Sequence, residues 1–399
     1  MTQPNSFVLT DTTQSTYVDT FQLTSNDRPG LSSTPWSIRK RRLHGGLSDG
    51  VDLVDVSVGS LEVSICPTRG MGIWRGKLAG EPLGWNSPVQ GPVHPAFIQR
   101  DELGGIGWLA GFDEWIVRCG LNNNGAPATD RLLDNTGAEQ TMSLPLHGRI
   151  ANIPAHHVRI ELRTEPAPSI NVIGVVDEAM LFFPQLRLET RIEFPLGAPK
   201  FVIHDRVTNL RSQPAEIELL YHTNFGTPLL EEGSRFLAPI ERLAPINAHS
   251  QKGLDRWKED PAPIPGVIEE CFVMKLLADP NDRRSLAMLH NRSRDKACLL
   301  RFSLDQLPWF TLWKNPAALS DGYVTGLEPG TDLPNAKPFE RASGRVVKLA
   351  PGAHYDIDLS VEVTDNARQV ADWEKEISLK QSISPPKIET GLPADLTPG

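Results

Sequence analysis

Residues 186–194 read LRLETRIEF, and this stretch indicates the fold class. Its side chains alternate one by one, with Leu186, Leu188, Thr190, Ile192 and Phe194 on one face and Arg187, Glu189, Arg191 and Glu193 on the other. Alternation with a period of two is typical of a β-strand with one buried face. Residues 355–363, YDIDLSVEV, repeat the pattern far along the chain.

Further strands are predicted on both sides of this stretch, at 51–58, 60–66, 156–163, 171–176, 200–207, 215–222, 271–277, 284–290 and 297–303. Turn residues such as Pro and Gly separate them, and the chain has 34 prolines and 32 glycines. One helix is predicted at about 365–379, where Val370, Trp373 and Ile377 share a face. Many strands without a βαβ rhythm predict an all-β protein, a large antiparallel β-sandwich with few short helices.

Composition limits the function. The formal net charge of the 399 residues is -9, which argues against nucleic-acid binding. No apolar run reaches the roughly 18 residues of a membrane span, and the first residues lack the pattern of a signal peptide. The four cysteines form no CxxC pair and fit reduced core cysteines. We therefore expect a cytoplasmic protein, a monomer or homodimer, without nucleic-acid or membrane partners.

The expected organisation is an N-terminal arm at 1–35, one sandwich domain at 36–380 and a Pro-rich tail at 381–399. Several signature motifs are missing from the sequence. It contains no GxGxxG after a strand, no Walker loop, no HExxH and no GxSxG. We therefore expect no cofactor and no metal.

The segment LLYHTNFG at 219–226 is the first candidate for chemistry. Parity along the predicted strand puts Ile217, Leu219 and Tyr221 on one face and His222 with Asn224 on the other. A neutral imidazole can give or take a proton near neutral pH. A histidine satisfied at a strand end is the competing interpretation.

Glu328 is the second candidate, in GLEPG at 326–330. The residue follows an apolar strand and precedes a Pro-Gly turn, so its carboxyl group can be partly desolvated. Desolvation raises a carboxyl pKa toward that of a useful general base. An exposed glutamate in a turn is the competing interpretation.

Three other segments offer contacts for a ligand. His147 precedes Gly148, which lets the backbone approach a ligand closely. Arg69 lies between Thr68 and a glycine and could present its guanidinium to hydroxyl or carboxylate oxygens. Trp313, in PWFTLWKN at 308–315, could stack on the apolar face of a sugar, although core packing is the commoner role of such aromatics.

These segments together resemble the aldose 1-epimerase (galactose mutarotase-like) superfamily, and most closely an uncharacterised aldose 1-epimerase-like branch. The matching elements, in family order, are LHG at 146–148, VTN at 207–209, the SQP turn at 212–214, HTNF at 222–225 and GLE at 326–328. The resemblance spans roughly 40–365. It implies the supersandwich fold of that superfamily and a monosaccharide or sugar-derivative substrate.

The resemblance also implies the reaction. Glu328 would remove the proton of the anomeric hydroxyl while His222 protonates the ring oxygen, so that the ring opens and closes again on either face. His147, Arg69, Asn224 and Lys314 would hold the sugar hydroxyls.

The chain departs from the galactose enzymes in two places. Their Asn-Arg pair has no clear match, and Arg118 is the residue that could replace it. Their His-Gly-Gly element reads His147-Gly148-Arg149 here. Two alternatives to mutarotation therefore stay open. One is epimerase, isomerase or lyase chemistry on a keto-sugar or sugar acid, with Arg69 binding a carboxylate. The other is a non-catalytic carbohydrate-binding protein.

Overall fold

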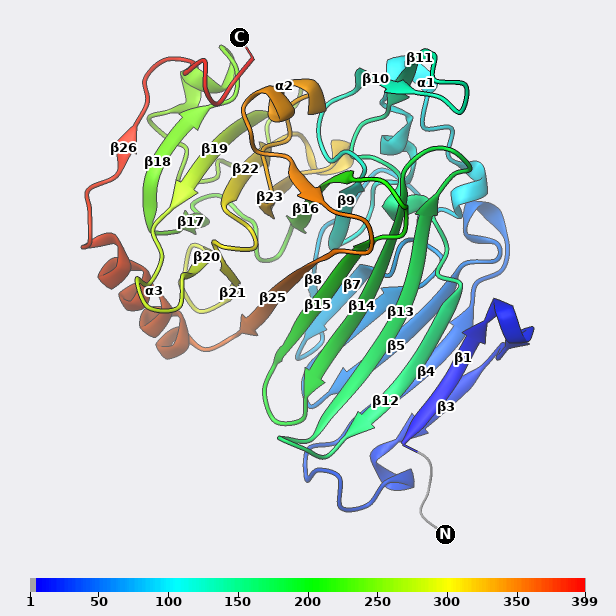
Figure 1. Ribbon diagram of the computed structural model, residues 1–399. Coiled ribbons are helices and arrows are strands. Elements are labelled where there is room, and N and C mark those ends of the chain that lie inside the picture. Colours follow the sequence, from blue (N-terminus) through cyan, green and yellow to red (C-terminus); the bar gives the residue numbers. More distant parts are fainter. Residues whose placement is uncertain (1–4, 399) are drawn as a thin grey trace.

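Two large β-sheets lie face to face in the computed structural model, which describes residues 5–398 (Figure 1). The first sheet has ten strands, in the order β17 (Arg235–Leu237), β20 (Arg284–His290), β21 (Ala297–Ser303), β25 (His354–Thr364), β15 (Lys200–Asn209), β14 (Gln185–Pro195), β13 (Ser169–Ala179), β12 (His157–Arg163), β1 (Ser6–Asp11) and β2 (Thr16–Tyr17).

The second sheet has fourteen strands. Its main path runs through β26 (Lys387–Ile388), β18 (Ile240–Pro245), β19 (Glu270–Leu276), β22 (Trp309–Asn315), β23 (Val324–Gly330), β16 (Ala215–Phe225), β9 (Ile116–Leu121), β7 (Gly72–Leu78), β6 (Leu61–Cys66), β5 (Asp52–Val58), β4 (Trp36–Arg42) and β3 (Phe21–Thr24). Off this path, β24 (Val347–Leu349) pairs with β16 and β8 (Glu81–Leu83) with β7. A separate ribbon joins β10 (Ala128–Leu133) to β11 (Glu139–Leu144).

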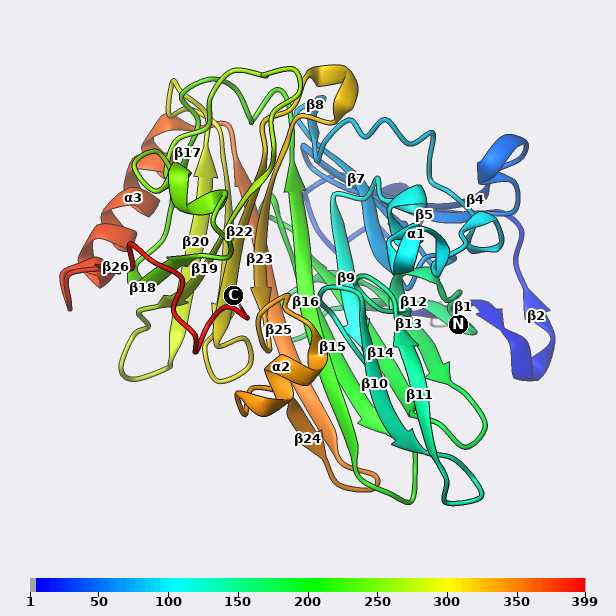
Figure 2. The ribbon, with the colours of Figure 1, turned by 90° about the horizontal axis from the view of Figure 1, so that it is seen from above.

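The main core lies between the two sheets. The face of β14 that the sequence predicted to be apolar is buried there, and β14 pairs antiparallel with β13 and β15. All pairings are antiparallel except that of β18 with β26 and one isolated bridge. The predicted all-β sandwich is thus confirmed. Figure 2 shows β16 between β9 and β23 in the middle of the second sheet, where it positions the candidate site.

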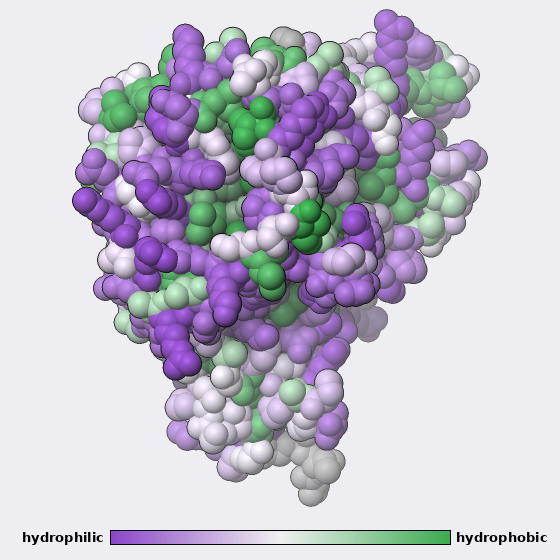
Figure 3. Space-filling model, turned by 90° about the vertical axis from the view of Figure 1, so that its left-hand side faces the viewer, coloured by the Kyte–Doolittle hydropathy of each residue, from purple (hydrophilic) through white to green (hydrophobic). Residues whose placement is uncertain are grey.

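Helices are few and lie outside the core. Residues 5–398 include three α-helices, α1 (Glu102–Gly105), α2 (Lys337–Ala342) and α3 (Ala367–Gln381). Asn366 caps α3 by accepting hydrogen bonds from the backbone N–H groups of Arg368 and Gln369. The predicted apolar face of α3 packs on residues of β20 and β21. Figure 3 looks at the side of the molecule with α3, where hydrophilic side chains surround scattered apolar ones.

The two ends of the chain join the sheets. Strand β1 pairs with β12 in the first sheet, while β3 pairs with β4 in the second. Near the other end, β26 extends the second sheet beside β18. No helix in the described part of the chain is long and apolar enough to cross a membrane.

Candidate active site

His222 projects from the face of β16 that turns away from the main core. The alternating residues Ile217, Leu219 and Tyr221 are fully buried in the main core, which leaves His222 and Asn224 on the opposite face. Parity along the strand therefore places the imidazole as the sequence predicted.

Asn224 fixes the tautomer of His222. Its amide nitrogen donates hydrogen bonds to the carbonyl oxygens of Glu114, at 3.0 Å, and His222, at 3.2 Å. The amide oxygen consequently faces His222 Nδ1 at 2.6 Å and accepts a hydrogen bond from its N–H. Nε2 of His222 is left free to exchange a proton on the other side of the ring.

Glu328, on the neighbouring strand β23, meets that nitrogen. Its Oε1 lies 3.1 Å from His222 Nε2, and the two residues are only 2% and 4% exposed. The contact lacks hydrogen-bond geometry, so Oε1 has no hydrogen-bond partner among the described residues. This carboxyl oxygen, which is almost inaccessible to solvent and lies beside an imidazole, is therefore available to a hydroxyl group that enters the site.

Burial shifts both groups toward their neutral forms. Desolvation, reinforced by the negative charge of Glu269, raises the pKa of Glu328 well above its usual value. Desolvation, together with nearby His147, lowers the pKa of His222 well below its usual value. Glu328 is accordingly favoured in its protonated form and His222 as the neutral imidazole.

Gly326 explains the glycine of the GLE element. A Cβ atom on this residue would lie 2.6 Å from Glu328 Oε1 and 3.1 Å from His222 Cε1. Only a residue without a side chain lets the carboxyl and imidazole groups meet at this point.

Aromatic rings surround the imidazole of His222. The ring centroids of Phe112, Trp313 and His147 lie 5.0, 5.2 and 5.5 Å from it. Trp313 is partly exposed and its indole N–H donates to Glu269 at 2.8 Å. Its exposed ring gives the site an apolar surface on which a sugar face can stack.

His147 is held in an unusual backbone conformation. Its φ of 58° is left-handed, and such strain in a residue other than glycine is often found at functional sites. Nδ1 donates to the backbone oxygen of Asn124 at 2.7 Å, and burial lowers the pKa of His147 to about 4. The ring is therefore neutral at physiological pH, with Nε2 as an acceptor for a ligand hydroxyl.

Arg69 lies near the site but is fully occupied by the protein. Its guanidinium donates to Glu114 at 2.6 Å, to Asn152 at 2.8 Å, and to the backbone oxygens of Val93 and Gly111. Because the backbone oxygen of Glu114 holds the Asn224 amide, Arg69 supports the imidazole indirectly.

Arg118 and Lys314 are not brought to the His222 face. Strand parity places them on the inner side of β9 and β22. Arg118 forms a bidentate pair with buried Asp205, at 2.5 and 2.9 Å. Lys314 lies 3.3 Å from Asp260 and donates to the backbone oxygen of Glu259 at 2.7 Å.

Several residues of the site have no counterpart in the sequence motifs. Phe112 and Glu114 come from the segment 111–115, GFDEW, which precedes β9. Asn124 accepts a hydrogen bond from His147, and Glu269 accepts one from Trp313, each from a loop distant in sequence. None belongs to a recognisable pattern, so only the folded chain identifies them.

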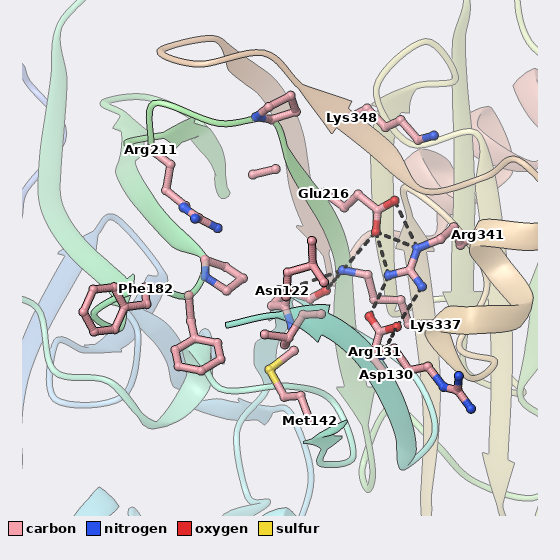
Figure 4. Close-up of a pocket in the computed structure, with 16 residues that line it drawn as sticks. Asn122, Asp130, Arg131, Met142, Phe182, Arg211, Glu216, Lys337, Arg341 and Lys348 are labelled. Carbon is pink, nitrogen blue, oxygen red and sulfur yellow. Dashed lines mark hydrogen bonds and ion pairs between the residues drawn. The ribbon is translucent and has the colours of Figure 1, made fainter. Parts of the chain in front are cut away.

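A cavity of about 510 Å³ lies elsewhere, between the β10–β11 ribbon, β16 and α2 (Figure 4). Four of its charged groups, Asp130, Glu216, Lys337 and Arg341, are paired with one another. Arg341 binds both Asp130 and Glu216, while Lys337 donates to the backbone oxygen of Asn122. The described residues contain no group of three or more His, Cys, Asp or Glu side chains placed to hold a metal ion.

The two-layer all-β fold, with an imidazole and a carboxyl group in contact on one sheet, defines a galactose mutarotase-like protein. Residues 48–363 match the family described as a domain of unknown function, DUF4432, and the chain belongs to that family. A comparison with curated proteins gives no match.

Solved structures agree with this classification. A Klebsiella pneumoniae protein called a "putative aldose 1-epimerase" is 34% identical, with a TM-score of 0.90 over 97% of this chain and 98% of that one. A galactose mutarotase-like protein from Clostridium acetobutylicum is 18% identical, with a TM-score of 0.54 over 82% of this chain and 98% of that one. An Escherichia coli K12 protein, also called a putative aldose 1-epimerase, shares 15% identity at a TM-score of 0.52, over 79% of this chain and 99% of that one. The last two show the common fold alone.

Proposed function

We propose that the protein interconverts the anomers of an aldose or aldose derivative, with Glu328 and His222 as the acid–base pair. The observation that carries the proposal is the 3.1 Å contact between His222 Nε2 and Glu328 Oε1 in a nearly dry environment. The two oxygens that exchange protons during anomerisation, the hydroxyl and the ring oxygen, are bonded to the same carbon. An acid and a base in direct contact match this spacing better than two groups on opposite sides of a wide cleft.

The proton path follows from the contact. When the substrate binds, the proton favoured on Glu328 in the empty site passes to Nε2 of His222. The ionised Glu328 then takes the proton of the anomeric hydroxyl, while His222 gives its proton to the ring oxygen. The C1–O5 bond breaks, the C1–C2 bond rotates, and closure from the other face reverses both transfers.

The remaining residues divide into two groups. His147 accepts a hydrogen bond from a sugar hydroxyl through Nε2, and Trp313 stacks on the sugar face. Asn224 positions His222, and Arg69 positions Asn224 through Glu114. Arg118 and Lys314 are assigned to the packing of the sheets rather than to the substrate.

The test is anomer exchange across a panel of aldoses, sugar phosphates and sugar acids, followed by NMR exchange spectroscopy. Glu328→Gln and His222→Gln should each lower kcat by about 10²–10⁴-fold, the usual contribution of a general acid or base. Arg206→Gln, an exposed ion-pair residue on the other sheet, is the matched control and should exchange normally. Wild-type exchange by both site variants on every substrate would refute the proposal.

The two alternatives make different predictions. Epimerisation or lyase chemistry gives a product that is no longer an anomer, which NMR and mass analysis of the reaction detect. A carboxylate substrate held by Arg69 has little support, since the donors of that guanidinium already bind protein groups. A non-catalytic sugar-binding protein would bind sugars equally well after Glu328→Gln and turn over none.

A further inference from the structure

The loop 145–149 presents side chains to two different places. His147 packs against Trp108 and His222, whereas Arg149 lines a separate cavity of about 280 Å³. Arg100, which precedes α1, lines the same cavity. This cavity adjoins the one in Figure 4, with Asn122 and Met142 common to both.

Neither arginine in this cavity forms a salt bridge with a described carboxylate of the protein. Among residues 5–398, the guanidinium groups of Arg100 and Arg149 have no hydrogen bond and no carboxylate within 4 Å. Several partly buried arginines do have carboxylate partners, as in the pairs Arg187–Asp177 and Arg301–Glu376. A half-buried guanidinium loses hydration, and this cost is normally offset by an acceptor.

The two guanidinium groups are close enough to repel each other. Burial and then the positive charge of Arg149 lower the pKa of Arg100. Both residues are partly buried, so solvent screens the repulsion incompletely. Two like charges facing one cavity form a site that an anion would stabilise.

The carboxyl groups that line the cavity are already committed. Glu178 accepts hydrogen bonds from the backbone N–H groups of Leu121 and Asn122, at 2.8 and 3.2 Å. Asp177 binds Arg187 through both oxygens, at 2.7 and 2.8 Å. Glu178 also attracts both arginines, but Arg187 neutralises Asp177, so the two guanidinium groups leave the cavity with a net positive charge.

We propose that this cavity binds an oxyanion, a phosphate or carboxylate group, between the guanidinium groups of Arg100 and Arg149. Guanidinium groups suit this role because their planar donor pairs match the oxygens of phosphates and carboxylates. Met142 and Phe183 line the cavity beside them and can cover an apolar part of the ligand. The inference is independent of the acid–base assignment of Glu328.

The test is a calorimetric titration of the full-length protein at low ionic strength, with inorganic phosphate in one arm and acetate in the other. Arg100→Gln and Arg149→Gln should each weaken binding by about tenfold or more, which is the loss of one charge-assisted hydrogen bond. Arg131→Gln is the matched control, because Arg131 is exposed on the neighbouring ribbon and already bound to Glu139. The arm that binds more tightly identifies the oxyanion.

A thermal unfolding series separates this site from the catalytic pair. Phosphate should raise the Tm of the wild type and of Glu328→Gln equally, but not that of the Arg100→Gln/Arg149→Gln double variant. Potassium chloride at matched ionic strength controls for screening. The proposal is overturned if the wild type binds neither anion, if the double variant binds as tightly, or if Glu328→Gln abolishes binding.

Discussion

Nε2 of His222 lies 3.1 Å from Oε1 of Glu328, on adjacent strands of one sheet, with both side chains almost wholly buried. Their opposite pKa shifts have one common cause, since burial penalises the charged form of each group. Both groups are therefore favoured in their neutral forms, Glu328 with a proton and His222 as the uncharged imidazole. A pair of buried carboxyl groups, Glu218 on β16 and Asp332 after β23, also has raised pKa values because of burial.

Asn224 should control the tautomer of His222. Asn224→Ala removes the acceptor for Nδ1–H, so the proton can occupy Nε2 and block the exchange with Glu328. We expect kcat for anomer exchange to fall by about 10²-fold, the lower end of the contribution of a general acid or base.

Asn224→Asp keeps an acceptor, and its negative charge raises the pKa of His222. The pH–rate profile of Asn224→Asp should accordingly shift to higher pH, and profiles that coincide for the wild type and both variants would contradict this role.

Gly326 should be required for the position of Glu328. Gly326→Ala places a Cβ atom 2.6 Å from Oε1, too close for a nonbonded contact, and forces the carboxyl group to move. Because a small misplacement in an active site can cost about 10²-fold in rate, we expect a loss of that order. Gly391→Ala, where no atom lies within 4 Å, is the control. Exchange rates measured by NMR that are equal for the two variants would show that the glycine is not needed.

The sequence predicted the part of the site that depends on strand parity. Ile217, Leu219 and Tyr221 alternate cleanly, which assigns His222 and Asn224 to the opposite face. Arg118 could not be placed in this way. Both faces of β9 carry apolar side chains, Ile116 on one and Val117 with Cys119 on the other, so the strand shows no contrast between an apolar and a polar face.

Other parts of the site depend on contacts that only folding creates. Arg69 lies two residues after Pro67 and precedes a glycine, a context that fits a ligand contact as well as a buried support. Its true partners, Glu114 and Asn152, lie 45 and 83 residues further along the chain. No local pattern encodes such pairings, and the same holds for the contact of Phe112 with His222.

Arg69 should matter more for stability than for the chemistry itself. Arg69→Met leaves the carboxyl group of Glu114 buried without its partner, which typically costs about 3–5 kcal/mol in the free energy of unfolding. Arg41→Met, which breaks a half-exposed pair with Asp55, should cost about 1 kcal/mol or less. Urea unfolding of both variants measures the difference. Equal losses of stability would contradict the role of Arg69 as a buried support.

The buried carboxyl pair of Glu218 and Asp332 should make stability depend on pH. Burial raises the pKa of Glu218 to about 7, although a side-chain hydrogen bond with Asp332 opposes part of this rise. Burial and the negative charge of Glu218 raise the pKa of Asp332 well above its usual value. The folded chain then binds more protons than the unfolded chain between roughly pH 5 and 7. Stability consequently falls as the pH rises through this window.

Glu218→Gln should reduce that dependence, because a neutral amide has no proton to release while Asp332 keeps its own. A shift of this size corresponds to a cost on the order of 3 kcal/mol at alkaline pH, which the variant avoids. The new amide must still hold the backbone N–H of Asn124, now bonded to Glu218 at 3.1 Å, so the comparison rests on the pH slope rather than on absolute stability. Other buried groups, such as Asp113, titrate in both proteins and cancel in the difference.

The measurement is urea unfolding at pH 5.5 and 8.5. The free energy of unfolding of Glu218→Gln should increase relative to that of the wild type as the pH rises. Glu139→Gln, an exposed control, should follow the wild type, and parallel slopes for all three proteins would mean that Glu218 stays ionised in the fold.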